Sequence, residues 1–156
     1  MRRRALIQEK LTRSVIGAFY DVYNTLGFGF REYLYSMALE RELIARGHRV
    51  AREVSIVIFY KGQELGRETM DMVVDEALVV EVKSTFDLRH GVRNQLYSYL
   101  HGSRMEVGLL LHFGPTPKFY RVISSNADFL SAPSAQSAES DNALVTDSSG
   151  SHRDPG

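Results

Sequence analysis

The stretch that decides the predicted fold is Met70-Asp71-Met72-Val73-Val74-Asp75-Glu76-Ala77-Leu78-Val79-Val80-Glu81-Val82-Lys83. Two apolar runs of β-branched and other hydrophobic residues are separated by three residues, which is typical of two buried strands joined by a tight loop. Alternate residues of a strand share one face of the sheet, so Glu81 and Lys83 point the same way. Ionisable side chains in such apolar strands are unusual, and we regard them as candidate site residues.

The register of this hairpin decides whether a third ionisable residue joins them. If residues 75–77 form the loop, Val74 lies opposite Leu78, and Asp71 then lies opposite Glu81 with the two Cβ atoms about 4.5–5.5 Å apart. A slip of one residue would send Asp71 to the other face. The sequence therefore predicts a cluster of two carboxylates and one lysine, but only in this register.

Such a cluster suits the hydrolysis of phosphodiester bonds. Carboxylate oxygens hold Mg²⁺ or Mn²⁺, and the bound metal activates water and neutralises the charge that builds on phosphate. The ammonium group of Lys83 can orient the attacking water, stabilise the transition state or act as a general base. The same spacing also fits an amphipathic strand whose Asp71, Glu81 and Lys83 simply face solvent, and the spacing alone leaves both interpretations open.

Along the rest of the chain, the spacing of hydrophobic residues changes from a helical period to a strand period and back. Thr12 is a plausible cap for the first helix, Gly27-Phe28-Gly29 suits a sharp reversal, and the second helix is expected to present Leu34, Ala38 and Ile44 to the core. The order of elements predicts an α/β protein with a mixed β-sheet flanked by helices. The expected elements are helices over 12–26 and 31–46, strands over 54–60, 69–74 and 78–83, a helix over 87–101, and strands over 107–111 and 119–123.

The composition is that of an ordinary globular protein. The 156 residues include 44% apolar and 24% charged residues, with 19 basic and 19 acidic side chains and no cysteine. This length favours one domain, and the absence of cysteine excludes disulfides and thiolate metal sites. No apolar run approaches the ~18 residues of a membrane helix. Residues 1–4 look like the charged front of an export signal, but no apolar segment of useful length follows them, so we expect a cytoplasmic protein. The histidines His48, His101 and His112 show no metal-ligand spacing.

The last part of the chain differs in composition from the rest. Residues 131–156 contain seven Ser and four Ala and carry a net charge of −3, which leaves residues 1–130 at +3. A segment with so little apolar surface cannot offset its ordering entropy. We therefore expect a folded domain over 1–130 and a disordered Ser/Ala-rich tail over 131–156.

Three motifs carry a resemblance to a known family. Asp71 followed by Glu81-Val82-Lys83 resembles the PD-(D/E)XK nuclease signature, and Gly29-Phe30-Arg31-Glu32-Tyr33-Leu34-Tyr35 is similar to the motif of the GxxExxY protein family within that superfamily. Gln95-Leu96-Tyr97-Ser98-Tyr99 resembles the Q-xxx-Y motif of RecB-like members. The resemblance covers about residues 12–124 and implies a restriction-endonuclease-like core.

The resemblance also implies roles for the acidic residues. Asp71 and Glu81 would ligate Mg²⁺ or Mn²⁺, Glu32 would add a third acidic group beside the metal, and Lys83 would assist the attack by water. Met70 stands where the signature has proline. On its position alone, Glu32 could instead stabilise the N-terminus of its helix through the helix dipole.

Gln95 and Tyr99 lie four residues apart and so share one helical face. The resemblance implies that they steady Lys83 or a phosphate group, whereas the simpler interpretation is a helix surface with one buried aromatic ring. Arg89, His90 and Arg93 precede or flank them and could contact a phosphate backbone without reading sequence.

The sequence thus predicts a Mg²⁺-dependent nuclease acting on DNA or RNA. The chain shows no evident target-recognition domain, so specificity would come from a protein partner, from a homodimer, or would be absent. One alternative is a non-catalytic nucleic-acid-binding or partner-interaction module that retains the nuclease fold. Another is a toxin or defence component whose tail contacts a partner.

Overall fold

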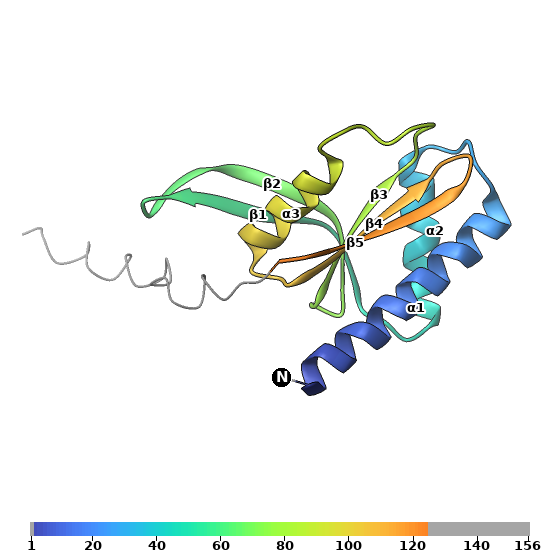
Figure 1. Ribbon diagram of the computed structural model, residues 1–156, viewed down its shortest axis with the longest axis horizontal. Coiled ribbons are helices and arrows are strands. Elements are labelled where there is room, and N and C mark those ends of the chain that lie inside the picture. The colour runs from blue at the N-terminus through green and yellow to red at the C-terminus, as the bar shows by residue number, and fades with distance from the viewer. Residues whose placement is uncertain (1, 125–156) are drawn as a thin grey trace, which may run out of the picture.

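A computed structural model describes residues 2–124, with side chains from residue 8 onward. The tail predicted over 131–156 lies outside the described residues. The described part is an α/β fold with a five-stranded mixed sheet, as predicted (Figure 1). Its elements are α1 (Arg2–Leu26), α2 (Glu32–Ala45), β1 (Val50–Tyr60), β2 (Gln63–Val74), β3 (Leu78–Lys83), α3 (Val92–Ser103), β4 (Val107–Phe113) and β5 (Pro117–Ile123).

Helix α1 begins ten residues earlier than predicted, and Thr12 is not its cap. The Thr12 hydroxyl donates to the Gln8 carbonyl oxygen at 2.7 Å, a bond that serine and threonine make inside helices. The preceding residues include Gln8, Glu9 and Lys10, which are good helix formers. The periodic apolar residues thus show where the buried face of α1 begins, but the helix itself begins earlier.

Two other helix predictions need correction. The buried apolar residues of α2 are Tyr35, Leu39 and Leu43, and Ala38 packs against the same core as predicted. Ile44 was predicted to face the core but is 55% exposed, because Leu43 takes that place. Helix α3 begins at Val92 rather than at residue 87, after Gly91 with φ of 92°. None of the helices within residues 2–124 combines the length and apolar character that crossing a membrane requires.

The sheet has the strand order β1-β2-β3-β4-β5, and only the β3–β4 pair is parallel. One face packs on α1 and α2 around Phe19, Leu39, Val80 and Phe113. The other face packs on α3 around Val79, Leu96 and Leu110. Because Val79 faces α3, Glu81 and Lys83 on the same strand lie on the α3 side of the sheet.

The β1–β2 hairpin changes face where it leaves the sheet. Met72 and Val74 pack on the α1–α2 side and Val73 packs on the α3 side, yet Met70 packs on the α3 side too. At this point Glu53 of β1 has φ of 52°, between the register pairs Arg52↔Met72 and Val54↔Met70. Non-glycine residues held at positive φ are strained and cluster at functional sites. Beyond this point the hairpin projects from the body alongside α3 (Figure 1).

A polar junction ties α1 to the two connections at the opposite end of β2. The His48 imidazole lies between the Ser14 hydroxyl, 2.7 Å from Nε2, and the Asp75 carboxylate, 2.7 Å from Nδ1. The Arg49 N–H donates to the same carboxylate at 2.8 Å. Ser14, His48 and Asp75 are the residue types of a catalytic triad. A triad also needs free N–H groups near the serine to stabilise an oxyanion, but Ser14 lies inside α1, where the neighbouring backbone N–H groups are bonded within the helix. The arrangement is therefore a structural tether.

We expect Asp75→Asn to lower the free energy of unfolding by about 1–2 kcal/mol near neutral pH, because it removes a charged hydrogen-bond acceptor. Burial acts to raise the pKa of Asp75, but the hydrogen bonds from Arg49 and His48 outweigh it and hold the pKa below its ordinary value. A lowered pKa stabilises the fold above the unfolded-state pKa, and this contribution is lost as pH falls through the folded-state pKa. The difference in stability between Asp75→Asn and the wild type should therefore vanish at acidic pH.

Thermal or urea unfolding from neutral to acidic pH measures this effect. Glu76→Gln is the matched control, because Glu76 is the next residue in the same turn and its side chain is 82% exposed. Equal losses of stability in both variants would contradict the tether.

Candidate functional site

The β2–β3 register brings Asp71 and Glu81 together as predicted. Val74 pairs with Leu78, and the last backbone pair of this ladder is Met72↔Val80. At the next position the Asp71 N–H donates to Glu81 Oε1 at 3.1 Å, and the Val82 N–H donates to Asp71 Oδ2 at 2.9 Å. Where β2 and β3 separate, these backbone N–H groups thus donate to carboxylate oxygens instead of to carbonyl oxygens of the neighbouring strand. We call Asp71 and Glu81 at this fork the acidic pair.

The acidic pair resists a second negative charge. Glu81 is only 4% exposed. Burial, and then the charge of Asp71, raise the pKa of Glu81 to about 8, although Lys83 acts to lower it. A second negative charge on the pair is therefore unfavourable at neutral pH unless a cation is added. This is the electrostatic property expected of a cation-binding pair.

Lys83 and Glu32 lie at the end of β3. Lys83 Nζ is 4.0 Å from Glu32 Oε1, and the Ser84 N–H donates to Glu32 Oε2 at 3.4 Å. Both side chains are partly exposed, Lys83 at 26% and Glu32 at 43%. Glu32 occupies the first turn of α2 and reaches over the end of the strand. Lys83 is thus close to Glu32 and within electrostatic reach of Glu81.

The segment from Gly27 to Tyr35 has a structural explanation. The Tyr35 hydroxyl donates to the Gly27 carbonyl oxygen at 2.5 Å and accepts from the Phe30 N–H at 3.3 Å. Its fully buried ring stacks on Phe113 with centroids 4.1 Å apart. Gly29 has φ of 120°, which side chains disfavour. Tyr35 therefore closes the loop that aims the N-terminus of α2, and so Glu32, at β3.

Tyr99 and Gln95 differ in exposure, since Tyr99 is buried and Gln95 is exposed. Tyr99 is 6% exposed. Burial, and then the charges of Glu81, Glu68 and Asp71, raise the pKa of Tyr99 to about 12, so its phenol lies within electrostatic reach of the acidic pair. Gln95 is exposed one turn earlier on α3. Glu68 was not predicted, because its approach to this site depends on the face change of the β1–β2 hairpin.

The predicted ligand set of Asp71, Glu81 and Glu32 is not preformed. Within residues 2–124 no three His, Cys, Asp or Glu side chains converge to form a ready-made metal site. Glu32 instead faces Lys83 and Ser84. The acidic pair alone still suits Mg²⁺ or Mn²⁺, because Mg²⁺ is commonly bound by one or two carboxylates together with water and substrate phosphates.

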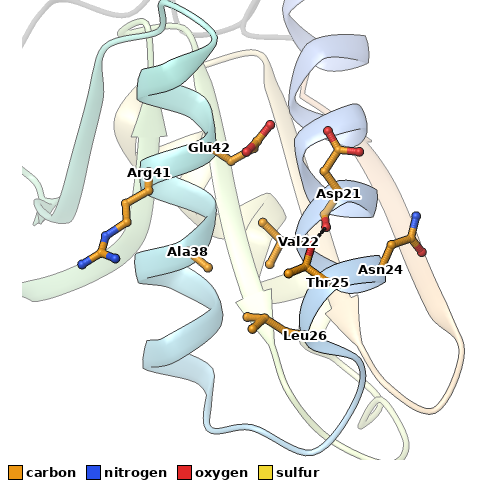
Figure 2. A pocket seen from close by; sticks show the side chains of 8 residues that line it. All are labelled: Asp21, Val22, Asn24, Thr25, Leu26, Ala38, Arg41 and Glu42. Carbon is orange, nitrogen blue, oxygen red and sulfur yellow. Dashed lines mark hydrogen bonds between the residues drawn. The ribbon is translucent and has the colours of Figure 1, made fainter.

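A hollow of about 610 Å³ lies between α1 and α2, on the side of the sheet away from the acidic pair. Figure 2 shows Asp21 and Glu42 facing it and Arg41 directed away from it. Both carboxylates are already paired with Arg46, Asp21 at 2.5 Å and Glu42 at 3.2 Å. Its acidic groups are therefore neutralised within the fold, and we assign no chemistry to this hollow.

Comparisons with known proteins bear on the same region. The family model described as "PD-(D/E)XK nuclease superfamily" matches residues 9–122, which include the acidic pair and Lys83. A solved structure titled "Crystal structure of SSO0001" is 20% identical, with a TM-score of 0.49, and the alignment covers 88% of this chain and 67% of that chain. No curated protein matches the sequence.

Proposed function

The chain belongs to the PD-(D/E)XK nuclease superfamily, and on this premise we propose that it is a nuclease that hydrolyses phosphodiester bonds of DNA or RNA with the help of Mg²⁺ or Mn²⁺. The observation that carries the proposal is the acidic pair at the β2–β3 fork with Lys83 on the same face. The restriction-endonuclease-like core positions these groups from consecutive strands.

Each residue of the proposed site has a distinct role. Asp71 and Glu81 would hold the divalent cation, which would lower the pKa of bound water and neutralise charge on the phosphate. Lys83 would donate a hydrogen bond to the attacking water or to a phosphate oxygen whose charge grows in the transition state. The acidic pair by itself repels a phosphate, so cation binding and substrate binding are expected to be cooperative.

Glu32 would act mainly through Lys83. Its 4.0 Å approach to the ammonium supports a role in holding the lysine in place. Tyr99 would limit the mobility of the acidic pair from the α3 side, and exposed Gln95 would reach a phosphate of the substrate. We further propose that the chain is a GxxExxY protein and that a protein partner or a homodimer supplies any specificity.

Replacement of Asp71 by Asn tests the metal site. The variant keeps an oxygen that accepts from the Val82 N–H but loses one charge of the pair. We expect Mg²⁺ or Mn²⁺ affinity, measured by calorimetry, to fall by more than the roughly 10- to 100-fold that loss of an outer-shell partner costs. Cleavage of DNA and RNA should be lost in parallel.

Glu76→Gln serves as the control, since it removes one exposed carboxylate from the turn between the same two strands. Undiminished metal affinity in Asp71→Asn would contradict the site. Metal binding by the wild type without cleavage of DNA or RNA would favour the non-catalytic binding module instead.

A further inference from the structure

Three basic side chains lie side by side on the α3 side of the sheet, beginning at the proposed site. Lys83 pairs in register with His112 of β4, and His112 pairs with Lys118 of β5. Register partners on neighbouring strands share a face and lie about 4.8 Å apart, so the row spans about 10 Å from Lys83 to the β5 edge. His112 is buried, so the lysines at the two ends of this row are the groups that would attract a phosphate backbone.

A hollow of about 410 Å³ opens along this row, and its lining includes Phe86, His112, Lys118 and Tyr120. This volume is in the range of ordinary ligand sites. Phe86 is 71% exposed, and its ring contacts the half-exposed Phe28 edge-on with centroids 6.4 Å apart. An aromatic ring this exposed, in the same hollow as Lys118, has an open face for a flat ligand group.

His112 holds Thr85, the residue before Phe86, against β4. The His112 side chain is 4% exposed, and its Nε2 donates to the Thr85 carbonyl oxygen at 2.8 Å. The Thr85 hydroxyl lies 3.2 Å from the same nitrogen. Thr85 is therefore anchored to β4, which fixes where the chain enters Phe86 at the mouth of the hollow.

The basic character continues into a neighbouring hollow of about 360 Å³ that shares Leu88 and Tyr120 and includes Arg89 and Arg93. The Arg93 guanidinium lies over the Tyr120 ring, 3.7 Å from its centroid. Asp87 contributes a carboxylate to the first hollow. The cations Lys118, Arg89 and Arg93 nevertheless outnumber it along this surface.

We propose that this surface binds single-stranded nucleic acid, with an unpaired base stacked on Phe86 and an adjacent phosphate on Lys118. We call Phe86, Arg89, Arg93, Lys118 and Tyr120 the strand-binding surface. The inference rests on the proposed nuclease function and names its substrate class. Bases in a duplex are already stacked on one another and offer no free face to Phe86, whereas aromatic rings beside cations are the usual platform for single strands.

The charge balance also favours a single strand. Residues 1–130 carry a net charge of only +3. A net charge this small gives little long-range attraction for the dense phosphates of a duplex, so we expect stacking to contribute a substantial share of the affinity.

Binding of short, fluorescently labelled single-stranded DNA, single-stranded RNA and duplex DNA is measured by anisotropy in EDTA, with oligonucleotide integrity checked on a gel. Phe86→Ala should weaken single-strand binding roughly tenfold or more, and Phe86→Tyr should restore it, because stacking on one aromatic ring accounts for this range. Lys118→Gln should reduce the slope of log affinity against log salt concentration by about 0.7, and Lys118→Arg should not.

Phe59→Ala and Lys61→Gln are matched controls, because both residues are exposed near the tip of the β1–β2 hairpin. Equal affinity of wild type and Phe86→Ala for both single strands, or wild-type binding of duplex but of neither single strand, would overturn the inference. Cleavage is scored separately. A wild type that cuts while Phe86→Ala binds normally leaves the nuclease proposal intact, and a wild type that binds through Phe86 but never cuts leaves the strand-binding surface intact.

Discussion

Cleavage by the Lys83→Ala variant is expected to be about 10²- to 10³-fold slower than by the wild type, while its affinity for nucleic acid changes little. Lys83 lies on the face of Glu81 at the end of β3, where charge develops on the phosphate in the proposed reaction. A group that stabilises charge only in the transition state affects the rate and not the binding of substrate. Any contact that the partly exposed Lys83 makes with a phosphate of the bound substrate would add little to affinity, so its loss should leave binding nearly unchanged.

The measurement is single-turnover cleavage of single-stranded DNA and RNA with Mg²⁺ or Mn²⁺, alongside anisotropy. Lys61→Ala removes an exposed lysine from the β1–β2 turn and should change neither quantity. Unfolding curves check that the variant is folded. If Lys83→Ala cuts at the wild-type rate, Lys83 has no part in the chemistry. If it loses binding and rate equally, Lys83 is a binding residue.

The β2–β3 hairpin shows what local sequence can predict. The period of two places Asp71 opposite Glu81 once the three-residue loop is assumed, and the observed pairing of Val74 with Leu78 confirms that register. Buried strands such as β4 and the turn after α1 are equally local features, because apolar runs and closely spaced glycines mark them directly. The hydroxyl bond from Tyr35 to the Gly27 carbonyl oxygen, in contrast, has no local sequence signal.

Features that depend on packing between distant segments could not be predicted. The face change near Glu53 brings Glu68 toward Tyr99, yet nothing in a strand pattern signals a positive φ at a glutamate. His112 and Lys118 become neighbours of Lys83 only through the parallel β3–β4 register. Glu32 is a further example. Its motif indicated that it lies near the acidic site, but not that its carboxylate would contact Lys83.

Replacement of Glu81 by Gln is expected to make the protein more stable at alkaline pH and inactive as a nuclease. Burial and the charge of Asp71 raise the pKa of Glu81 from 4.5 to about 8. Below pH 4.5 the carboxyl is protonated in both the folded and unfolded states, so it has no effect on stability. As pH rises from 4.5 to 8 the unfolded state ionises first, and the wild type loses stability relative to the variant. Above pH 8 the whole penalty is present.

The size of this penalty is on the order of a few kcal/mol, since each unit of pKa shift corresponds to about 1.4 kcal/mol. The amide of Gln keeps an oxygen that can accept from the Asp71 N–H, so the substitution changes the charge and little else. The variant should therefore unfold at a higher temperature than the wild type at pH 8–9 in EDTA, and at nearly the same temperature near pH 4. Activity is lost because one proposed metal ligand is gone.

Addition of Mg²⁺ or Mn²⁺ separates the metal site from a simple buried acid. A cation that binds only the folded state stabilises it by mass action, so the wild type should gain stability and the Gln variant should gain much less. The difference seen in EDTA at pH 8–9 should then shrink or reverse. A difference between the two proteins that does not depend on pH would contradict the repulsion between Asp71 and Glu81. If the cation stabilises both proteins equally, Glu81 is not a ligand, because the cation must then bind elsewhere in the chain.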